Sequence, residues 1–178
     1  MRVGGAKKEE RKDKNNFMPK QNIKERTLVI LKPDALQRGL LGEIVHRFER
    51  KGIKIAGMKM MQLSNLLLDR HYVQHKGKHF LPRLKNFMMT LPVVVIVFEG
   101  LDVVRVVRTM CGTTDGKNAL LGTIRGDFSM SISQNIVHSS EDLKAAKREI
   151  GIFFKSAELF NYKKPDEHFF YNEEERGV

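Results

Sequence analysis

The sequence of 178 residues has very little cysteine and no long apolar run. Its one cysteine, Cys111, excludes an internal disulfide and favours a reducing compartment. The longest apolar run, residues 91–98, is interrupted by Pro92 and is far too short to cross a bilayer. The first residues lack the apolar core of a secretory signal, and they include acidic residues that organelle transit peptides avoid. These absences predict a cytoplasmic protein with no membrane partner.

The sequence also lacks the common phosphate-binding signatures. Residues 112–118 resemble a P-loop, but three residues separate its two glycines where the motif requires four. In addition, Asn118 follows Lys117 at the position where Ser or Thr should hold magnesium. No glycine-rich kinase loop or kinase catalytic loop is present. If this protein transfers phosphoryl groups, it does so by another route, and a covalent histidine relay would be one.

Positive charge is in excess, with a formal net charge of +11. Residues 1–24 contain eight Lys or Arg and three Asp or Glu, which makes +5, so residues 25–178 carry the remaining +6. We interpret residues 1–24 as a disordered basic tail, because they are polar and have almost no periodic apolar residues. A solvated extension is the favoured interpretation, and contact with nucleic acid is the alternative. The excess in the remaining single domain predicts an anionic ligand such as a phosphate.

Four apolar segments predict strands, at residues 27–31, 53–63, 93–98 and 135–138. Because residues 93–98 are apolar without interruption, that strand is expected in the centre of the sheet. Helices are predicted at residues 40–51, 64–72, 82–90, 103–110 and 141–150. Ser64, Asp102 and Ser140 are expected to cap the second, fourth and fifth of these helices at their N-termini. Residues 112–122 are expected to form a loop, and residues 123–128 to lead into the last strand. This order predicts an α+β fold, a ferredoxin-like βαββαβ sandwich with helices on one face of a four-stranded antiparallel sheet.

His138 is the candidate nucleophile, because it lies at the end of the last predicted strand, where a helix is expected to follow. A nucleophilic imidazole needs one bare nitrogen and one protonated nitrogen. A carboxylate that accepts a hydrogen bond from the protonated nitrogen fixes this tautomer, and Glu149 is a candidate for that role. The alternative interpretation of His138 is a structural histidine of the core, and that of Glu149 is an ordinary acidic residue on the surface.

Phosphoryl transfer also needs positive charge around the phosphate oxygens. Lys32, Arg108 and Arg125 are basic residues at the ends of predicted elements. Thr114, in the glycine-flanked loop, offers a hydroxyl and a backbone N–H. Taken alone, each residue can be interpreted as an ordinary surface residue. Taken together, they predict a phosphate-sized pocket.

Three motifs resemble those of the nucleoside diphosphate kinase family in order and spacing. They are Lys32-Pro33-Asp34, the segment GTIRGDF at residues 122–128 and the segment NIVH at residues 135–138. The resemblance extends from about Arg26 to Tyr171. It implies a ping-pong transfer of the γ-phosphoryl group from ATP or another nucleoside triphosphate to a nucleoside diphosphate.

The resemblance also implies a role for each matching residue. His138 would carry the phosphoryl group on Nδ1, Glu149 would hold the other ring nitrogen, and Tyr72 would place its hydroxyl near the transferred group. Lys32 would be a catalytic residue as well. The nucleotide would be bound by Lys32, Phe80, Arg108, Thr114, Arg125, Ile132 and Asn135. Mg²⁺ would be held through the nucleotide phosphates with no protein ligand, and the chain would form a homo-oligomer, a hexamer or a tetramer. The base of the nucleotide would lie between Phe80 and Ile132, and stacking there would accept purines and pyrimidines alike.

The sequence departs from the family pattern at several positions. Ser139 replaces the usual glycine after the catalytic histidine, Glu141 replaces Asp, Ala35 replaces Gly, and Asp115-Gly116 replaces Asn-Pro. If position 139 requires a positive φ, serine would cost on the order of 1 kcal/mol. Two alternatives to an active enzyme follow. One is a catalytically weak nucleotide-binding or scaffold protein of the same fold, and the other, ranked last, is a protein that contacts nucleic acid through its tail.

Overall fold

The computed structural model describes residues 24–176, so residues 1–23 of the expected tail lie outside the described residues. The strands are β1 (Lys24–Leu31), β2 (Lys54–Met61), β3 (Val93–Leu101) and β4 (Val137–Ser139). The α-helices are α1 (Pro33–Gln37), α2 (Leu41–Arg50), α3 (Asn65–His71), α4 (Leu81–Met88), α5 (Val103–Cys111), α6 (Ile124–Phe128), α7 (Leu143–Phe153) and α8 (Glu173–Arg176). Short 3₁₀ turns lie at Val73–His75, Gly116–Asn118, Ser156–Glu158 and Glu167–Phe169.

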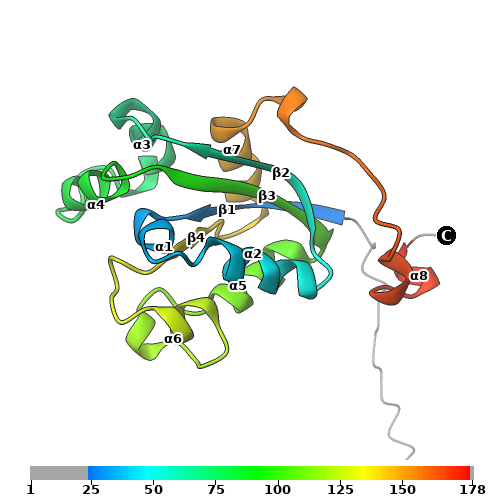
Figure 1. Ribbon diagram of the computed structural model, residues 1–178. Coiled ribbons are helices and arrows are strands. Elements are labelled where there is room, and N and C mark those ends of the chain that lie inside the picture. The colour runs from blue at the N-terminus through cyan, green and yellow to red at the C-terminus, as the bar shows by residue number, and fades with distance from the viewer. Residues whose placement is uncertain (1–23, 177–178) are drawn as a thin grey trace, which may run out of the picture.

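The four strands form one antiparallel sheet in the order β2-β3-β1-β4 (Figure 1). This order confirms the predicted ferredoxin-like α+β fold. The prediction of β3 as a central strand is also confirmed, since β3 lies between β2 and β1. The residues of β3 from Val93 to Phe98 are all buried, as a strand covered on both faces must be.

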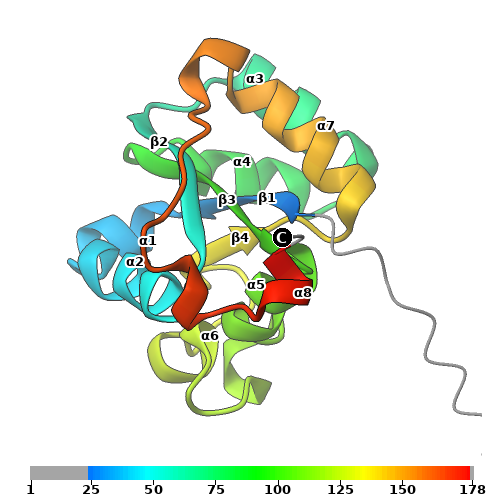
Figure 2. The same ribbon diagram turned by 90° about the vertical axis from the view of Figure 1, so that its right-hand side faces the viewer.

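The prediction that helices cover one face of the sheet is wrong, because they cover both (Figures 1 and 2). Alternate residues of β1 point to opposite faces and enter two separate cores. Val29 and Leu31 pack with residues of α2, α5 and α6, whereas Leu28 and Ile30 pack with residues of α3, α4 and α7. The uninterrupted apolar pattern of the central strands is the physical reason, since each face of the sheet has to be shielded from water.

Several element boundaries differ from the prediction. β1 begins at Lys24, which pairs with Leu101, so the last residue assigned to the tail belongs to the sheet and β3 extends to residue 101. Residues 124–128, which were expected only to lead into the last strand, form helix α6. The cap of this helix is Thr123, whose hydroxyl accepts a hydrogen bond from the backbone N–H of Gly126.

The expected helix caps were right at one position and wrong at two. Ser64 caps α3, as predicted, by accepting from the backbone N–H of Leu67. Asp102 precedes α5 but has a φ of 50° and makes no capping bond, because its carboxylate pairs with Arg105. The cap of α7 is Asp142 and not Ser140, so this helix begins two residues later than predicted.

The C-terminal segment runs from the end of α7 back across the molecule to α8, which lies beside the N-terminal end of β1 (Figure 2). The hydroxyl of Tyr162 donates to the backbone carbonyl of Ile55, and Lys24 pairs with Glu167. These contacts join the last part of the chain to β1 and β2. No helix within residues 24–176 has the length and apolar content needed to cross a membrane.

Candidate active site

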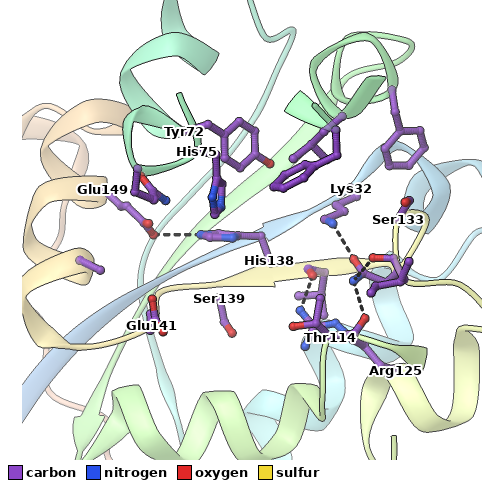
Figure 3. A pocket seen from close by; sticks show the side chains of 18 of the residues that line it. Lys32, Tyr72, His75, Thr114, Arg125, Ser133, His138, Ser139, Glu141 and Glu149 are labelled. Atoms are coloured by element: carbon purple, nitrogen blue, oxygen red, sulfur yellow. Dashed lines mark hydrogen bonds and ion pairs between the residues drawn. The ribbon is translucent and has the colours of Figure 1, made fainter. Parts of the chain in front are cut away.

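A cleft of about 1510 Å³ is lined by residues from all three predicted motifs (Figure 3). All ten residues singled out from the sequence line this cleft. They are Lys32, Tyr72, Phe80, Arg108, Thr114, Arg125, Ile132, Asn135, His138 and Glu149. They come from α5, α6, α7 and β4 and from the segments that follow β1, α3, α5 and α6 or precede α4, so the fold brings together residues that are far apart in the chain.

The backbone that leads to His138 is unusually constrained. Ile136, two residues before it, has a φ of 68°, a left-handed conformation that a β-branched residue rarely adopts. Its backbone N–H donates to Oδ2 of Asp34 at 3.0 Å, and its carbonyl accepts from the backbone N–H of Lys32 at 2.9 Å. His138 itself pairs with Ile30 in the sheet. The Lys-Pro-Asp segment therefore fixes the strand that carries the imidazole.

The imidazole of His138 is held by the carboxylate of Glu149. Nε2 of His138 and Oε2 of Glu149 lie 2.9 Å apart, as the dashed line in Figure 3 marks. The hydroxyl of Ser140 donates to the same carboxylate oxygen at 2.8 Å, and the guanidinium of Arg148 lies 3.3 Å from the other oxygen. Burial raises the pKa of Glu149, but the hydrogen bonds and charges of the surrounding groups outweigh it and lower the pKa overall.

This arrangement assigns the two nitrogens of the His138 ring. An ionised carboxylate can only accept a hydrogen bond, so it selects the tautomer in which Nε2 carries the proton. Nδ1 then has a free lone pair. Because the ring lines the cleft and is partly exposed, that lone pair is accessible to a ligand.

Lys32, Asn135 and Thr114 form a second connected group. Nζ of Lys32 donates to Oδ1 of Asn135 at 2.5 Å, and Nδ2 of Asn135 donates to the carbonyl of Thr114 at 2.7 Å. Lys32 lies at the carboxyl end of β1 and is almost fully buried. Burial, together with the charge of Arg125, lowers the pKa of Lys32 to about 8, although Asp34 opposes the shift. The ammonium group is thus poised to gain from an anionic ligand.

Arg125 is the other buried cation of the cleft. Its guanidinium donates to the carbonyl of Gly112 at 2.5 Å and to the carbonyl of Val137 at 2.7 Å, so it connects the loop after α5 with β4. Arg108 lines the same region and is exposed. Figure 3 shows Lys32, Arg125 and Thr114 arranged along one side of the cleft, beside His138. The concentration of cations there can neutralise phosphate groups.

The outer part of the cleft is apolar. Phe80 and Ile132 both line it and remain substantially exposed. The ring of Phe80 meets that of His75 edge-on, with centroids 5.4 Å apart. Tyr72, in contrast, is buried beside His71, and burial together with the nearby Glu149 raises the pKa of its hydroxyl. Tyr72 therefore remains a hydrogen-bond donor at neutral pH.

The structure accommodates two of the departures from the family pattern, Ser139 and Gly116. Ser139 lies within β4 and is not among the described residues that have a positive φ, so serine causes no backbone strain there. Gly116 is buried, and a Cβ at this position would lie 2.4 Å from the carbonyl oxygen of Ser129. Close packing therefore holds the loop at Gly116.

Sequence reasoning missed three residues around the His138–Glu149 pair. Ser140 was interpreted as a helix cap, but its hydroxyl supports the carboxylate. Arg148 was not singled out, because a basic residue on a helix is common on protein surfaces. His71 is fully buried, and its ring centroid lies 4.7 Å from that of His138. The sequence gives no signal for this contact, since the two histidines are 67 positions apart.

The fold and the cleft together define a class of protein. A ferredoxin-like sheet that brings an accessible histidine, a supporting carboxylate and several cations into one open cleft is suited to phosphoryl transfer. Comparison with known proteins narrows this class. A family model described as nucleoside diphosphate kinase matches residues 25–159.

Curated relatives and solved structures agree with the family model. A nucleoside diphosphate kinase of Parabacteroides distasonis is 53% identical over 139 residues, which cover 78% of this chain and 91% of the relative. The structure of a halophilic nucleoside diphosphate kinase from Halobacterium salinarum in complex with CDP has a TM-score of 0.82 and 41% identity, and covers 84% of this chain and 100% of that chain. A nucleoside diphosphate kinase from Borrelia burgdorferi, a transition-state mimic with bound vanadate and ADP, has a TM-score of 0.78 and 38% identity, over 83% and 98% of the two chains. The chain belongs to the nucleoside diphosphate kinase family and is a nucleotide-binding phosphotransferase.

Proposed function

We propose that the protein transfers the γ-phosphoryl group of a nucleoside triphosphate, typically ATP, to a nucleoside diphosphate through a phosphohistidine at His138. The observation that carries the proposal is the hydrogen bond between Nε2 of His138 and Glu149, which leaves Nδ1 bare toward the cleft. In the first step the Nδ1 lone pair attacks the γ-phosphorus, and the bond to the bridging oxygen breaks, so the diphosphate leaves with the electron pair. In the second step a β-phosphate oxygen of the acceptor attacks the phosphohistidine and releases the imidazole.

Glu149 stabilises the positive charge that the imidazole gains while it carries the phosphoryl group. Its carboxylate is already fixed by Ser140, so little reorganisation is needed when the charge develops. Tyr72 is buried close to this pair and supplies a hydroxyl that stays protonated. We assign His138 the role of nucleophile, Glu149 that of positioning and stabilising group, and Tyr72 that of a donor near the transferred phosphoryl group.

The cations on the same side of the cleft bind the phosphates. Arg108 and Arg125 offer planar guanidinium groups that suit phosphate oxygens, and Lys32 offers a compact charge. Thr114 adds a hydroxyl and a backbone N–H from the loop. Lys32 and Asn135, which are hydrogen-bonded to each other, are suited to contact the ribose 3′-hydroxyl as well. Phe80 and Ile132 enclose the base at the apolar end, and stacking there favours acceptance of any base.

Mg²⁺ fits this site through the nucleotide and not through protein ligands. The cleft offers cations where the phosphates would lie, and Mg²⁺ is usually held by substrate phosphate oxygens and water in such sites. When bound, it would neutralise the charge of the β- and γ-phosphates. Lys32, Arg108 and Arg125 would bind the remaining phosphate oxygens.

The proposal also includes the oligomeric state of the protein and its location in the cell. We expect a homo-oligomer, a hexamer or a tetramer, because large apolar side chains are exposed on the loop after α5 and on β2. Those residues are Met58 and Met60 on β2, Leu120 and Leu121 on the loop after α5, and Met130 just after α6. Sedimentation velocity on the full chain tests this, and a monomer at micromolar concentration would contradict it. Cytoplasmic location remains a prediction from the sequence, as does any contact of the basic tail with nucleic acid.

Incubation with γ-labelled ATP and Mg²⁺, without acceptor, tests the catalytic proposal. Wild type should retain label in an acid-labile, base-stable form, His138→Ala should retain none, and His46→Ala, which changes an exposed histidine of α2, should behave as wild type. Added nucleoside diphosphate should remove the label and form the corresponding triphosphate. Equal labelling of wild type and His138→Ala would overturn the proposal, and binding of ADP without any label would favour the weak or scaffold protein instead.

A further inference from the structure

His71 is a polar side chain whose burial the fold does not explain. It lies at the end of α3, is fully buried, and neither of its ring nitrogens has a hydrogen-bond partner. Burying a polar group without a partner costs free energy, and native proteins rarely do so without another reason. Its ring packs edge-on against Phe153 and His138, with centroids 5.2 and 4.7 Å away. A phenylalanine would fill this space without that cost, so the nitrogens themselves call for an explanation.

Three metal-ligating side chains converge at this point. One ligand atom each from His71, His138 and Glu149 lies within 4.8 Å of the other two, and no other such group of His, Cys, Asp or Glu occurs within residues 24–176. Two imidazoles and one carboxylate, with water as the fourth ligand, are a donor set that Zn²⁺ adopts in proteins. Ligand atoms around a tetrahedral Zn²⁺ lie roughly 3.3 Å apart, given bond lengths near 2.0–2.1 Å. Nε2 of His138 and Oε2 of Glu149 are already 2.9 Å apart.

We propose that His71, His138 and Glu149 form a binding site for a transition-metal ion such as Zn²⁺, and that its occupancy blocks the nucleophile. His138 and Glu149 line the cleft, which gives the ion a way in and provides water for the fourth position. Mg²⁺ does not compete for this site, because it prefers oxygen ligands over imidazole. Two groups oppose metal binding at Glu149. The guanidinium of Arg148 lies 3.3 Å from Oε1, but Arg148 is partly exposed to solvent and the metal would use Oε2. The hydroxyl of Ser140 donates to Oε2, where the metal would take only the place of the hydrogen bond from His138.

Metal binding would reverse the tautomer of His138. This consequence, unlike the binding itself, rests on the proposed function. Without metal, the single ring proton is on Nε2 and faces Glu149. A Zn²⁺ ion takes the lone pair of Nε2, so the proton must move to Nδ1, and no proton leaves the protein. A protonated Nδ1 has no lone pair for the γ-phosphorus, so the enzyme cannot accept a phosphoryl group while the ion is bound.

Binding is tested on the full chain with Zn²⁺ alone, in the absence of nucleotide, by isothermal titration calorimetry. We expect one high-affinity ion per chain in wild type and in His46→Phe, and an affinity lower by about tenfold or more in His71→Phe. Co²⁺ in place of Zn²⁺ should give the visible absorption of a tetrahedral site, and His71→Phe should lose it. His71→Gln, with circular dichroism as a check on folding, repeats the test if the phenylalanine variant does not fold. Equal Zn²⁺ affinity in wild type and in the folded His71 variants would overturn the proposal.

A separate measurement tests inhibition. Labelling of His138 from γ-labelled ATP and excess Mg²⁺ is followed while a metal buffer sets the free Zn²⁺ concentration. Zn²⁺ should suppress labelling of wild type at concentrations that fill the site, and His71→Phe should need about tenfold more. Undiminished labelling with the site filled would overturn the inhibitory role. A wild type that is never labelled, even without Zn²⁺, would instead refute the proposed function and leave the binding result unaffected.

Discussion

The carboxylate of Asp34 accepts a hydrogen bond from the backbone N–H of Ile136, with Oδ2 and the nitrogen 3.0 Å apart. Ile136 has a φ of 68°, a conformation that costs a residue with a Cβ roughly 1–2 kcal/mol. The backbone N–H of Lys32 donates to the carbonyl of the same residue. The strained residue is thus held from both sides, two positions before His138.

Replacing Asp34 with alanine should therefore release this backbone. We expect Asp34→Ala to lower the free energy of unfolding by about 1–3 kcal/mol, because a buried N–H loses its acceptor. It should also slow phosphoenzyme formation, because the left-handed conformation that orients β4 is no longer supported. Urea unfolding and rapid-quench labelling measure the two effects. Glu49→Ala, which changes an exposed acid of α2, is the control, and equal behaviour of the two variants would contradict this role.

The charge of Glu149 should matter more than its shape. Glu149→Gln keeps the size of the side chain and a carbonyl oxygen that can accept from Nε2 of His138, but it removes the negative charge. Since hydrogen bonds to charged groups contribute about 1.5–3 kcal/mol, the rate of phosphoenzyme formation should fall by roughly 10- to 100-fold. Glu141→Gln changes an exposed carboxyl that lines the same cleft and should have little effect. Similar losses in both variants would show that general electrostatics, and not the His138–Glu149 contact, is responsible.

Much of the fold could be predicted because it depends on patterns that are local in the sequence. Burial decides where strands and helices lie, and apolar patterns in the sequence signal it. Such patterns are the apolar runs of β1 and β3 and the four-residue spacing of Ile44 and Phe48 on α2. The distribution of helices over both faces was implied by the uninterrupted run at residues 93–98, which requires cover on each side. The single-face prediction failed because it followed the element order and gave this requirement too little weight.

The residues of the site could be predicted from the sequence, but their conformations and mutual contacts could not. Lys32, Arg125 and His138 could be named from motifs, whereas the left-handed Ile136 could not, because isoleucine is among the residues least expected there. Ser140 was misassigned because a serine before a helix usually caps it, and only the tertiary fold brings it to Glu149. Contacts between segments distant in the chain depend on the packing of the sheet and cannot be derived from spacing alone.

Nucleotide binding should depend on pH through Lys32. Its pKa is lowered to about 8, first by burial and then by the charge of Arg125, against the opposing charge of Asp34. Phosphates bind the protonated ammonium, so ADP affinity should be fully present below about pH 8 and should fall as the pH rises through it. Lys32→Arg keeps its charge and should bind ADP with little change between about pH 7 and about pH 9.5. Calorimetric titration with ADP at both pH values measures this, and an equal decline in the variant would exclude Lys32 as the titrating group.

Acid should destabilise the protein through His71. Burial, with a further contribution from the charge of His138, lowers the pKa of His71 to about 3 from 6.5, although Glu149 opposes the shift. Between these values the unfolded chain binds a proton that the native state does not, so stability falls as the pH falls, by up to about 1.4 kcal/mol per pH unit. From about pH 7.5 to about pH 5, wild type should lose roughly 2 kcal/mol more than His71→Phe. Urea unfolding at the two pH values provides the comparison, and parallel losses in both proteins would show that His71 titrates normally.

Gly116 should be required by the loop that carries Thr114. A Cβ at position 116 would lie 2.4 Å from the carbonyl oxygen of Ser129 and 2.5 Å from its Cβ, so the two backbone segments would have to separate. We expect Gly116→Ala to lower the free energy of unfolding by about 1–3 kcal/mol. It should also weaken ADP binding, because the carbonyl of Thr114 holds Asn135 in the cleft.

Gly151→Ala is the matched control for this variant. Gly151 lies in α7 with open space around it, so alanine there should stabilise the helix by up to about 1 kcal/mol and leave ADP binding unchanged. Urea unfolding and calorimetric titration with ADP separate the two variants, since close packing penalises a methyl group only at position 116. A Gly116→Ala protein as stable as wild type would mean that the loop yields easily, and its contact with Asn135 would then contribute little to the shape of the cleft.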